Sequence, residues 1–355
     1  MLTSKPDTSA GFRPTVSLNP DTAYPSLDCL RADGRLDASL LSPALQQVLL
    51  REARVRNIVS SMLIEGEVVA LDRALRVMDS RAPETANERA VLQLGAVYDR
   101  IWKGGFVTLS VSSLESLHRE IFEDVLPGSI AGILKQRQNA IVDGSTGRIL
   151  FLPTPPDRVE KELASLFTWF EENQLNYPPP VVAGLFFAEF QAIHPFADGN
   201  GRTGRILNLS LLKQLRMKNA PLVPLDSRFF RSRSRYYEML ATTNSGRRYD
   251  LWLRYFVGEL HRAYKLALTR TDLRPVVERY EGRVARDLLT WILSGTGGWF
   301  SHGDFPNPAG FSIPAVTKAL KRLADDRILM SRGERRGRRY RVSPAFLASL
   351  EQGRP

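Results

Sequence analysis

Twelve consecutive residues, His194 to Arg205, constrain the fold of this chain more than any other stretch. They read His-Pro-Phe-Ala-Asp-Gly-Asn-Gly-Arg-Thr-Gly-Arg and lie between two apolar segments. Residues 185–193 have the composition of a buried helix, and leucines at four-residue spacing predict a second helix over 203–215. The sequence therefore predicts a glycine-rich turn that joins two packed helices.

The turn carries groups that can bind a phosphate chain and move a proton. The imidazole of His194 has an ordinary pKa of about 6.5 and can accept a proton near neutral pH. The carboxylate of Asp198 is an oxygen ligand of the kind that Mg²⁺ takes when it also binds phosphates. Gly199 and Gly201 let the backbone adopt a positive φ and approach a ligand closely, and successive amides in such a turn form an anion-binding nest.

Two arginines extend this anion site onto the first turn of the following helix. Arg202 and Arg205 are three residues apart, so both side chains can reach the same bound anion. The helix N-terminus adds a dipole that favours negative charge. Together these features predict a site for a nucleoside triphosphate.

The same glycines also fit a dinucleotide-binding fingerprint. Gly199, Gly201 and Gly204 have the required spacing, and Asp226 lies at about the distance expected of a ribose-binding acid. That fingerprint requires a strand directly before its first glycine, whereas helix-like residues precede the turn here. A P-loop is excluded because no Gly-Lys-Ser or Gly-Lys-Thr follows the glycines.

The twelve residues resemble the Fic (Fido) family motif, H-x-F-x-[D/E]-G-N-G-R-x-x-R, and every fixed position is matched. The resemblance implies a mainly α fold, in which a Fic helical core carries a small β-hairpin flap. It also implies an enzyme that moves a nucleotide monophosphate, usually AMP from ATP, onto a hydroxyl of a protein. UTP, GTP or a phosphocholine nucleotide stay open as alternative donors.

The resemblance also assigns roles to individual residues. It implies that His194 is the catalytic base, that Asp198 holds Mg²⁺ and that Phe196 anchors the turn in the core. A Tyr-Tyr pair and an Asn that follow the second helix would line the adenosine pocket, and core packing is the alternative for either Tyr. The ATP-binding residues implied in this way are Glu65, Asp198, Gly199, Asn200, Gly201, Arg202, Thr203, Gly204, Arg205, Tyr236, Tyr237 and Asn244.

A second segment resembles the inhibitory motif [S/T]-x-x-x-E-[G/N] of this family, with Ser61, Glu65 and Gly66 at its fixed positions. Taken alone, the segment is the end of an amphipathic helix with an exposed Glu. The resemblance implies that Glu65 pairs with Arg205 and keeps a γ-phosphate from this guanidinium, a contact worth about 1.5–3 kcal/mol. In some relatives the equivalent Glu activates water to remove AMP, and that role stays open.

A β-hairpin is predicted over 139–152, where two short β-like runs flank a turn at 144–147. In the family this place is the flap, which clamps a segment of the target protein by strand pairing. A solvent-exposed hairpin without such a function is the alternative. His118, on the apolar face of an earlier helix, is expected to be a packed helix histidine.

The C-terminal part is basic. From Arg270 onward there are 16 Lys and Arg against 9 Asp and Glu, or +7 of the net +11. Helices over 284–293 and 311–323 and a basic strand–turn–strand are similar to a winged helix-turn-helix, although its middle helix is not evident. Such modules bind nucleic acid or mediate dimerisation, so a nucleic acid and a homodimer are both candidate partners. A DNA-binding regulator with a Fic core of other or vestigial activity is the alternative function.

The predicted domains are an N-terminal arm and inhibitory helical segment over 1–90, a Fic catalytic core over 91–270 and a winged-helix-like domain over 275–355. Residues 1–38 hold several prolines and predict an extended arm. The N-terminus has no apolar signal-peptide core, and no apolar run is long enough to span a bilayer. A single cysteine, Cys29, suits a reducing compartment. The expected location is therefore the cytoplasm, without a membrane partner.

Overall fold

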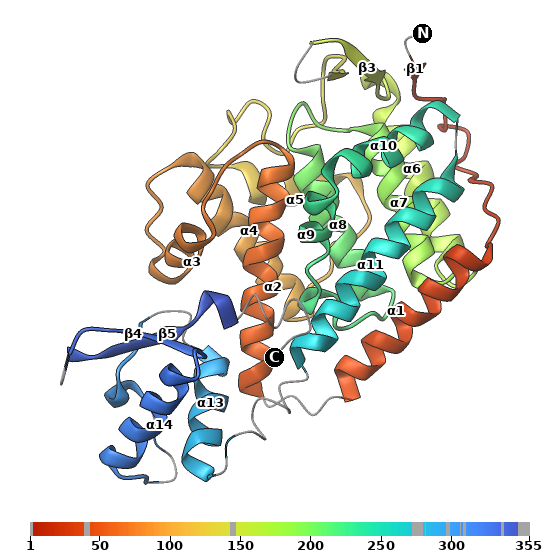
Figure 1. Cartoon of the computed structure of the whole chain (residues 1–355). Helices are drawn as coiled ribbons and strands as arrows, with labels where there is room; N and C mark the ends of the chain where they lie inside the picture. The colour runs from red at the N-terminus through yellow and green to blue at the C-terminus, as the bar shows by residue number, and fades with distance from the viewer. Residues whose placement is uncertain are drawn as a thin grey trace. The chain divides into compact units, whose positions relative to one another are not determined.

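The structure is a computed structural model, and it describes residues 3–38, 43–142, 147–246, 248–271, 280, 282–295, 299–305, 307, 310–334 and 337–346. It is mainly helical, as predicted (Figure 1). Contacts divide the chain into two compact units, the first built from 1–34 and 53–264 and the second from 35–52 and 265–355. The domain boundaries expected from the sequence stay a prediction.

The elements have the following bounds in chain order: β1 (Thr3–Ser4), α1 (Pro20–Ala38), α2 (Pro43–Ile64), α3 (Leu71–Ser80), α4 (Ala86–Trp102), α5 (Val111–Phe122), β2 (Ile141–Val142), β3 (Ile149–Leu152), α6 (Pro156–Asn173), α7 (Pro179–Ile193), α8 (Asn200–Gln214), η1 (Ala220–Leu222), α9 (Leu225–Arg231), α10 (Arg233–Gly246), α11 (Tyr249–Thr271), α13 (Arg283–Gly295), η2 (His302–Asp304), α14 (Ile313–Asp325), β4 (Leu329–Arg332) and β5 (Arg339–Val342). Among the described helices, none is both long and apolar enough to cross a membrane.

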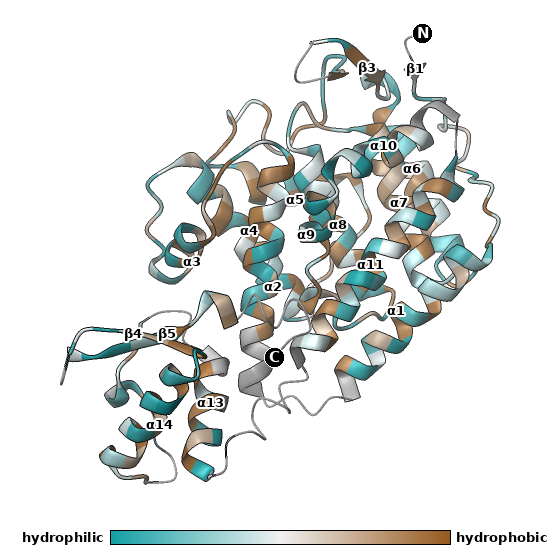
Figure 2. Cartoon of the chain, in the orientation of Figure 1, coloured by the Kyte–Doolittle hydropathy of each residue, from teal (hydrophilic) through white to brown (hydrophobic). Residues whose placement is uncertain are grey.

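Helices α7 and α8 form the centre of the first unit. Every residue of α7 from Pro180 to Ile193 is buried, which explains its nearly continuous apolar sequence. Helix α8 packs against α7 on one side, and α6 packs against α7 as well. The surrounding helices carry both hydrophobic and hydrophilic residues, as amphipathic helices do (Figure 2). The two helices predicted on either side of the glycine-rich turn are confirmed.

The expectation of an extended arm over 1–38 is wrong for its second half, which forms α1. Pro20 stands at the start of this helix, where a missing amide costs nothing, and Asp21 favours the first turn. The buried residues recur every three or four positions but are partly polar: they are Thr22, Ser26, Cys29, Ala32, Asp33 and Leu36. Because the stripe is not apolar, hydrophobic periodicity does not reveal the helix.

The N-terminal strand β1 adds a parallel edge to the predicted hairpin. Thr3 and Ser4 pair with β3, and the amide of Lys5 donates to the carbonyl of Leu152 over 2.8 Å. The Lys5 ammonium is buried within 2.7 Å of carboxylates from both α6 and α7. Residues 3–5 are therefore anchored in the first unit.

The hairpin itself is confirmed. Strands β2 and β3 are antiparallel, and β3 lies between β1 and β2 in a three-stranded sheet. Three residues of the turn predicted at 144–147 lie outside the described residues, which resume at Gly147.

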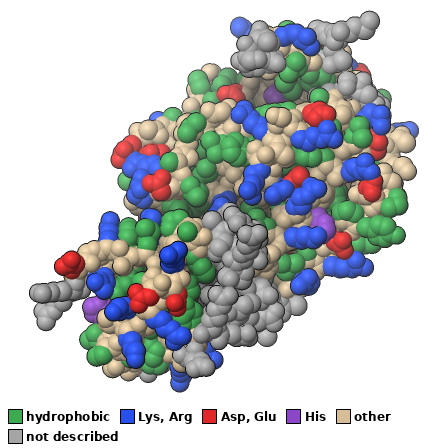
Figure 3. All heavy atoms as spheres, viewed as in Figure 1, with side chains coloured by type: hydrophobic (Ala, Val, Ile, Leu, Met, Phe, Trp, Pro, Cys, Tyr) green, Lys and Arg blue, Asp and Glu red, His purple; other side chains and the backbone are tan. Residues whose placement is uncertain are grey.

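The second unit has a separate hydrophobic core. Helices α13 and α14 pack together and against the antiparallel hairpin of β4 and β5. Between the helices, the described residues contain the short 3-10 turn η2 where a winged helix-turn-helix would have a helix. Lys and Arg side chains are spread over the visible face of this unit, with Asp and Glu between them (Figure 3). The winged-helix assignment stays a prediction.

Candidate active site

The turn between α7 and α8 has the positive φ that the sequence predicts at Gly199 but not at Gly201, which is the second residue of α8. His194 ends α7 in the left-handed region with a φ of 53°, and Gly199 precedes α8 with a φ of 76°. The side-chain amide of Asn200 closes the turn, because it accepts from the Phe196 amide and donates to the Phe196 carbonyl, each over 2.8 Å. Asn200 is buried and thus holds the backbone of the turn in place, rather than facing outward.

His194 is a neutral imidazole in this setting. Its Nδ1 lies 3.2 Å from the Gln191 carbonyl oxygen, to which it donates, so Nε2 carries the lone pair that can accept a proton. Burial lowers the pKa of His194 to about 4, and the positive charge of Lys135 adds to this effect. A base that is unprotonated at pH 7 is therefore available at the end of α7.

Arg205 on α8 is buried, and its guanidinium forms hydrogen bonds with Ser61 and Glu65 at the end of α2. The resemblance implied the pairing with Glu65. Its Nη2 donates to Oε1 of Glu65 over 2.8 Å and to the Ser61 carbonyl over 2.9 Å, and its Nε donates to Oγ of Ser61 over 2.7 Å. Burial opposes the charge of the guanidinium, but Glu65, Tyr236 and Asp226 act together against it and the pKa of Arg205 is raised. Gly66, which follows with a φ of 85°, turns the chain away from α2.

A second ion pair, which was not predicted from the sequence, lies beside the first. Nη1 of Arg202 donates to Oε2 of Glu67 over 2.7 Å, and the guanidinium stacks on the Phe122 ring with its carbon 4.5 Å from the ring centre. Burial raises the pKa of Glu67, against the effect of Arg202. The signal in the sequence was a second Glu two residues after Glu65. Both arginines of the turn therefore contact carboxylates from the segment that follows α2.

Three further residues of the predicted ATP site lie tightly against their neighbours. A Cβ on Gly201 would be 2.0 Å from Oε1 of Glu65, and one on Gly204 would be 2.1 Å from the Gln191 amide nitrogen. Thr203 is fully buried. Gly201 therefore faces the place that the Glu65 carboxylate occupies, whereas Thr203 and Gly204 pack inside the helix pair.

Asp198 is the residue expected to hold a metal. Its Oδ1 accepts from the Gly199 amide over 2.6 Å, and its side chain is exposed at the turn. Among the described residues, no group of three His, Cys, Asp or Glu side chains could hold a metal ion. One exposed carboxylate fits Mg²⁺ in the mode in which substrate phosphates and water supply the other ligands.

The residues predicted to line an adenosine pocket have different surroundings. Tyr236 is 1% exposed and stacks on Phe229, with the ring centres 4.9 Å apart, so it belongs to the core. Tyr237 is 43% exposed, and its hydroxyl donates to the Ile64 carbonyl over 3.0 Å at the end of α2. The side chain of Asn244 lies outside the described residues.

The protein is mainly helical, and His194, Arg202 and Arg205 lie around the N-terminus of α8. Comparison with known proteins identifies a family that has this motif. Residues 108–212 match the family described as Fic/DOC. This stretch includes the turn from His194 to Arg205, so the catalytic motif lies within a Fic/DOC domain.

Similar curated proteins carry the name "Protein adenylyltransferase Fic". One from Drosophila erecta is 26% identical over 204 residues, and one from Culex quinquefasciatus is 28% identical over 229 residues. These alignments cover 55% and 61% of this chain but 38% and 43% of the relatives, so the chain spans about two fifths of their length.

Solved structures share the fold. A Fic family protein from Desulfovibrio desulfuricans G20 has a TM-score of 0.65 at 23% identity, with 94% of this chain and 99% of that chain covered. Fic-1 from C. elegans has a TM-score of 0.58 at 19% identity, with 72% and 73% of the two chains covered. At these identities the likeness concerns the fold.

Proposed function

We propose that this protein transfers AMP from ATP to a hydroxyl group of a protein, including its own chain. The observation that carries the proposal is a neutral His194 on the same turn as the N-terminus of α8 and the guanidinium groups of Arg202 and Arg205. A base and an anion site are thus a few residues apart. The names of the curated relatives support the same reaction.

In the proposed reaction, Nε2 of His194 takes the proton from a Ser, Thr or Tyr hydroxyl. The hydroxyl oxygen forms a bond to the α-phosphorus of ATP, and the bond to the bridging oxygen of pyrophosphate breaks. Arg202, Arg205 and the backbone amides of Gly199 and Gly201 stabilise the negative charge on the phosphates. The protein thereby supplies positioning and charge, which dominate the catalysis of phosphoryl-type transfer.

Mg²⁺ would be held by Asp198 together with the phosphates of ATP. Bound there, it would neutralise phosphate charge and orient the phosphate chain.

The ion pairs of this structure suggest how the reaction is controlled. With Glu65 on Arg205 and Glu67 on Arg202, both guanidinium groups are engaged by carboxylates, and a polyphosphate must displace them. We propose that this is an autoinhibited state and that moving Glu65 away activates transfer. A reaction in which Glu65 activates water to remove AMP is the alternative use of the same carboxylate.

The proposed target segment docks on the flap at 139–152. Val142 and Leu150 are exposed there, at 50% and 43%, and can contact apolar side chains of an added strand.

The test incubates Glu65→Gly, the wild type and the double variant Glu65→Gly/His194→Ala with Mg²⁺ and ATP labelled at the α-phosphate. Glu65→Gly should label itself at least about tenfold faster than the wild type, because a charge-assisted bond of about 1.5–3 kcal/mol no longer holds Arg205. The double variant should not label. Parallel reactions with α-labelled UTP and GTP identify the donor. No label from any nucleotide with Glu65→Gly would refute transfer, and equal rates for Glu65→Gly and the wild type would refute the inhibitory role.

A further inference from the structure

His118 connects the catalytic turn to the segment that leads to the flap. It lies on α5, is fully buried and uses both ring nitrogens. The Gly132 amide donates to its Nδ1 over 2.8 Å, and its Nε2 lies 2.9 Å from the Asp198 carbonyl oxygen. Asp198 and Gly132 are far apart in the sequence, so the ring links two separate loops.

These two contacts determine the tautomer of the ring. Nδ1 must be unprotonated because it accepts from an amide, and Nε2 must carry the hydrogen because a carbonyl oxygen only accepts. The neutral ring therefore satisfies both backbone groups. A buried apolar side chain would fill the same space but leave a buried amide and a buried carbonyl without this partner, at a cost of about 1–3 kcal/mol each.

The ring is also packed against the turn itself. It stacks on Phe196, with ring centres 3.8 Å apart and planes inclined by 18°, and it contacts Phe122 of its own helix. A Cβ on Gly199 would lie 3.1 Å from Nε2 of His118 and 2.5 Å from the Phe122 ring. Helix α5 is thus in close contact with the backbone of the glycine-rich turn, whose amides are proposed to bind the phosphates.

The second loop runs beside the catalytic turn. Leu134 and Phe196 form an antiparallel bridge, and the Lys135 amide donates to the Pro195 carbonyl over 2.9 Å. Nδ2 of Asn139 donates to the Phe196 carbonyl over 2.9 Å. The path from Gly132 to the flap therefore follows the turn, and His118 holds its first residue.

We propose that His118 is a positioning residue that fixes the glycine-rich turn through Asp198 and the base of the flap through Gly132. It thereby fixes the positions of the phosphate-binding amides and of the target-binding strand relative to each other, without contacting either substrate. This inference rests on the proposed AMP transfer for its kinetic consequences, whereas the two contacts exist whatever the reaction is.

Two amide substitutions separate the two contacts, since an Asn amide reaches about as far as Nδ1 and a Gln amide about as far as Nε2. His118→Asn keeps an acceptor for Gly132 but loses the donor to Asp198. His118→Gln keeps the donor to Asp198 but loses the acceptor for Gly132. Both are made in the Glu65→Gly protein, and Leu114→Ala in the same protein is the control for lost packing of α5, where Leu114 is buried.

His118→Asn should lower kcat by about tenfold or more, because the phosphate-facing amides are displaced. His118→Gln should keep kcat within about threefold and instead raise the KM for the target protein, because the base of the flap is loosened. Leu114→Ala should lower Tm without either change. Equal kinetic losses in the Asn and Gln variants, in proportion to their loss of Tm, would overturn the proposal.

Hydrogen exchange gives a readout that is independent of catalysis. Amides in 195–203 should exchange faster in His118→Asn only, and amides in 128–136 should exchange faster in His118→Gln only. If the Glu65→Gly parent fails to label, the AMP-transfer proposal falls and the exchange pattern alone decides the role of His118. The same exchange pattern in both variants would refute the positioning role of His118.

Discussion

Oε1 of Glu65 lies 2.8 Å from Nη2 of Arg205, although 140 residues separate the two in the chain. The same carboxylate oxygen occupies the space directly beside Gly201, at the N-terminus of α8. A carboxylate and a phosphate are both anions that need the same donors, so they cannot occupy this place together. A phosphate that reaches Arg205 beside Gly201 must therefore displace the Glu65 carboxylate.

The neighbouring pair of Glu67 and Arg202 should act as a second restraint. Replacing Glu67 by Gln removes the negative charge but keeps the shape, so Arg202 becomes available to a phosphate. In the Glu65→Gly protein, Glu67→Gln should lower the KM for ATP by about three- to tenfold, less than the full value of a charge-assisted bond because Gln still accepts.

Initial rates over a range of ATP concentrations measure this effect. Glu238→Gln, which changes an exposed carboxylate of α10, is the control and should leave the KM unchanged. With Glu65 intact, Glu67→Gln alone should label slowly, since Arg205 is still engaged. An unchanged or higher KM in the double variant would contradict a restraining role for Glu67.

Features that a short stretch of sequence encodes could be predicted. The motif fixes the order of base, glycines and arginines, and the apolar runs around it fix two helices. The Glu65–Arg205 pair was predicted through a resemblance, because both ends of the contact belong to recognisable motifs. The hairpin of β2 and β3 was predicted because both strands are close in the sequence and separated by a turn signal.

Contacts between distant residues without a motif could not be predicted. Lys5 looks like a surface residue in the sequence, and only the fold brings Glu162 and Glu189 to it. His118 reads as a packed helix residue because its partners are backbone groups of other loops, which no side-chain pattern marks. Helix α1 was missed because polar residues form much of its buried face.

Lys5 should contribute strongly to the stability of the first unit. Its ammonium lies within 2.7 Å of Glu162 and of Glu189, and all three side chains are at most 4% exposed. Lys5→Met leaves the buried Glu189 without its cation and Glu162 with only Arg158, 3.8 Å away, which should reduce the free energy of unfolding by about 3–5 kcal/mol. Urea unfolding of the first unit, followed by far-UV circular dichroism, measures the change.

Arg235→Met, which breaks an exposed pair with Glu238, is the matched control and should cost less than about 1 kcal/mol. Adding Glu189→Gln to Lys5→Met should recover part of the loss, because one unpaired charge is removed. A loss for Lys5→Met as small as that of the control would show that the buried pair adds no net stability.

The depressed pKa of His194 makes stability depend on pH. The folded protein has this pKa at about 4, whereas an unfolded chain has an ordinary value of about 6.5. Between these values the unfolded state binds more protons, so stability is lost as the pH falls from about 6.5 to 4. Between pH 7 and 5, the wild type should lose about 2 kcal/mol more than His194→Ala, which lacks this group. Urea titrations of both proteins at pH 7 and at pH 5 measure this difference. If the two proteins lose the same free energy of unfolding, His194 is not held neutral by burial.

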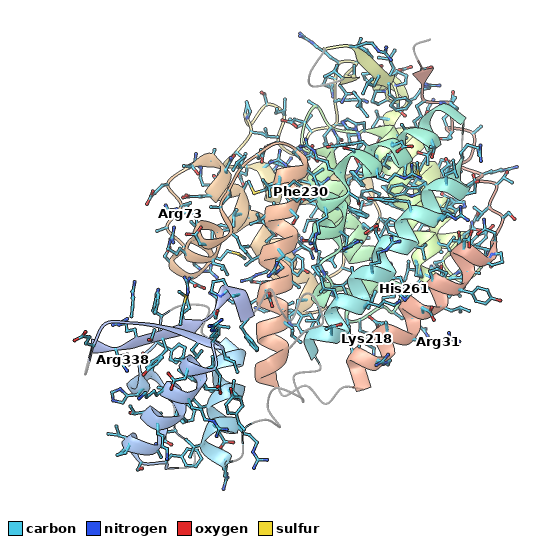
Figure 4. The ribbon with its side chains drawn as sticks, in the orientation of Figure 1. Arg31, Arg73, Lys218, Phe230, His261 and Arg338 are labelled. Carbon is cyan, nitrogen blue, oxygen red and sulfur yellow. The ribbon has the colours of Figure 1, made fainter. Side chains whose placement is uncertain are left out.

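The basic hairpin of the second unit predicts salt-dependent binding to nucleic acid. Arg332 and Arg341 stack on Trp299, at 4.2 and 5.3 Å from the ring centre, so they support the hairpin. Arg338 and Arg339 are exposed, and Figure 4 labels Arg338 on this hairpin. These two are the residues expected to contact phosphates.

The full chain should bind duplex DNA with an affinity that falls steeply with salt concentration. Arg338→Ser and Arg339→Ser together should reduce the slope of log K against log salt by about 2, one unit for each lost phosphate contact. Arg235→Ser, an exposed arginine of the first unit, should leave the slope unchanged. Fluorescence anisotropy of a labelled duplex at several salt concentrations measures these slopes. If the double variant keeps the wild-type slope, or if the wild type does not bind DNA, the hairpin does not contact phosphates. Dimerisation is then the role to test for this unit.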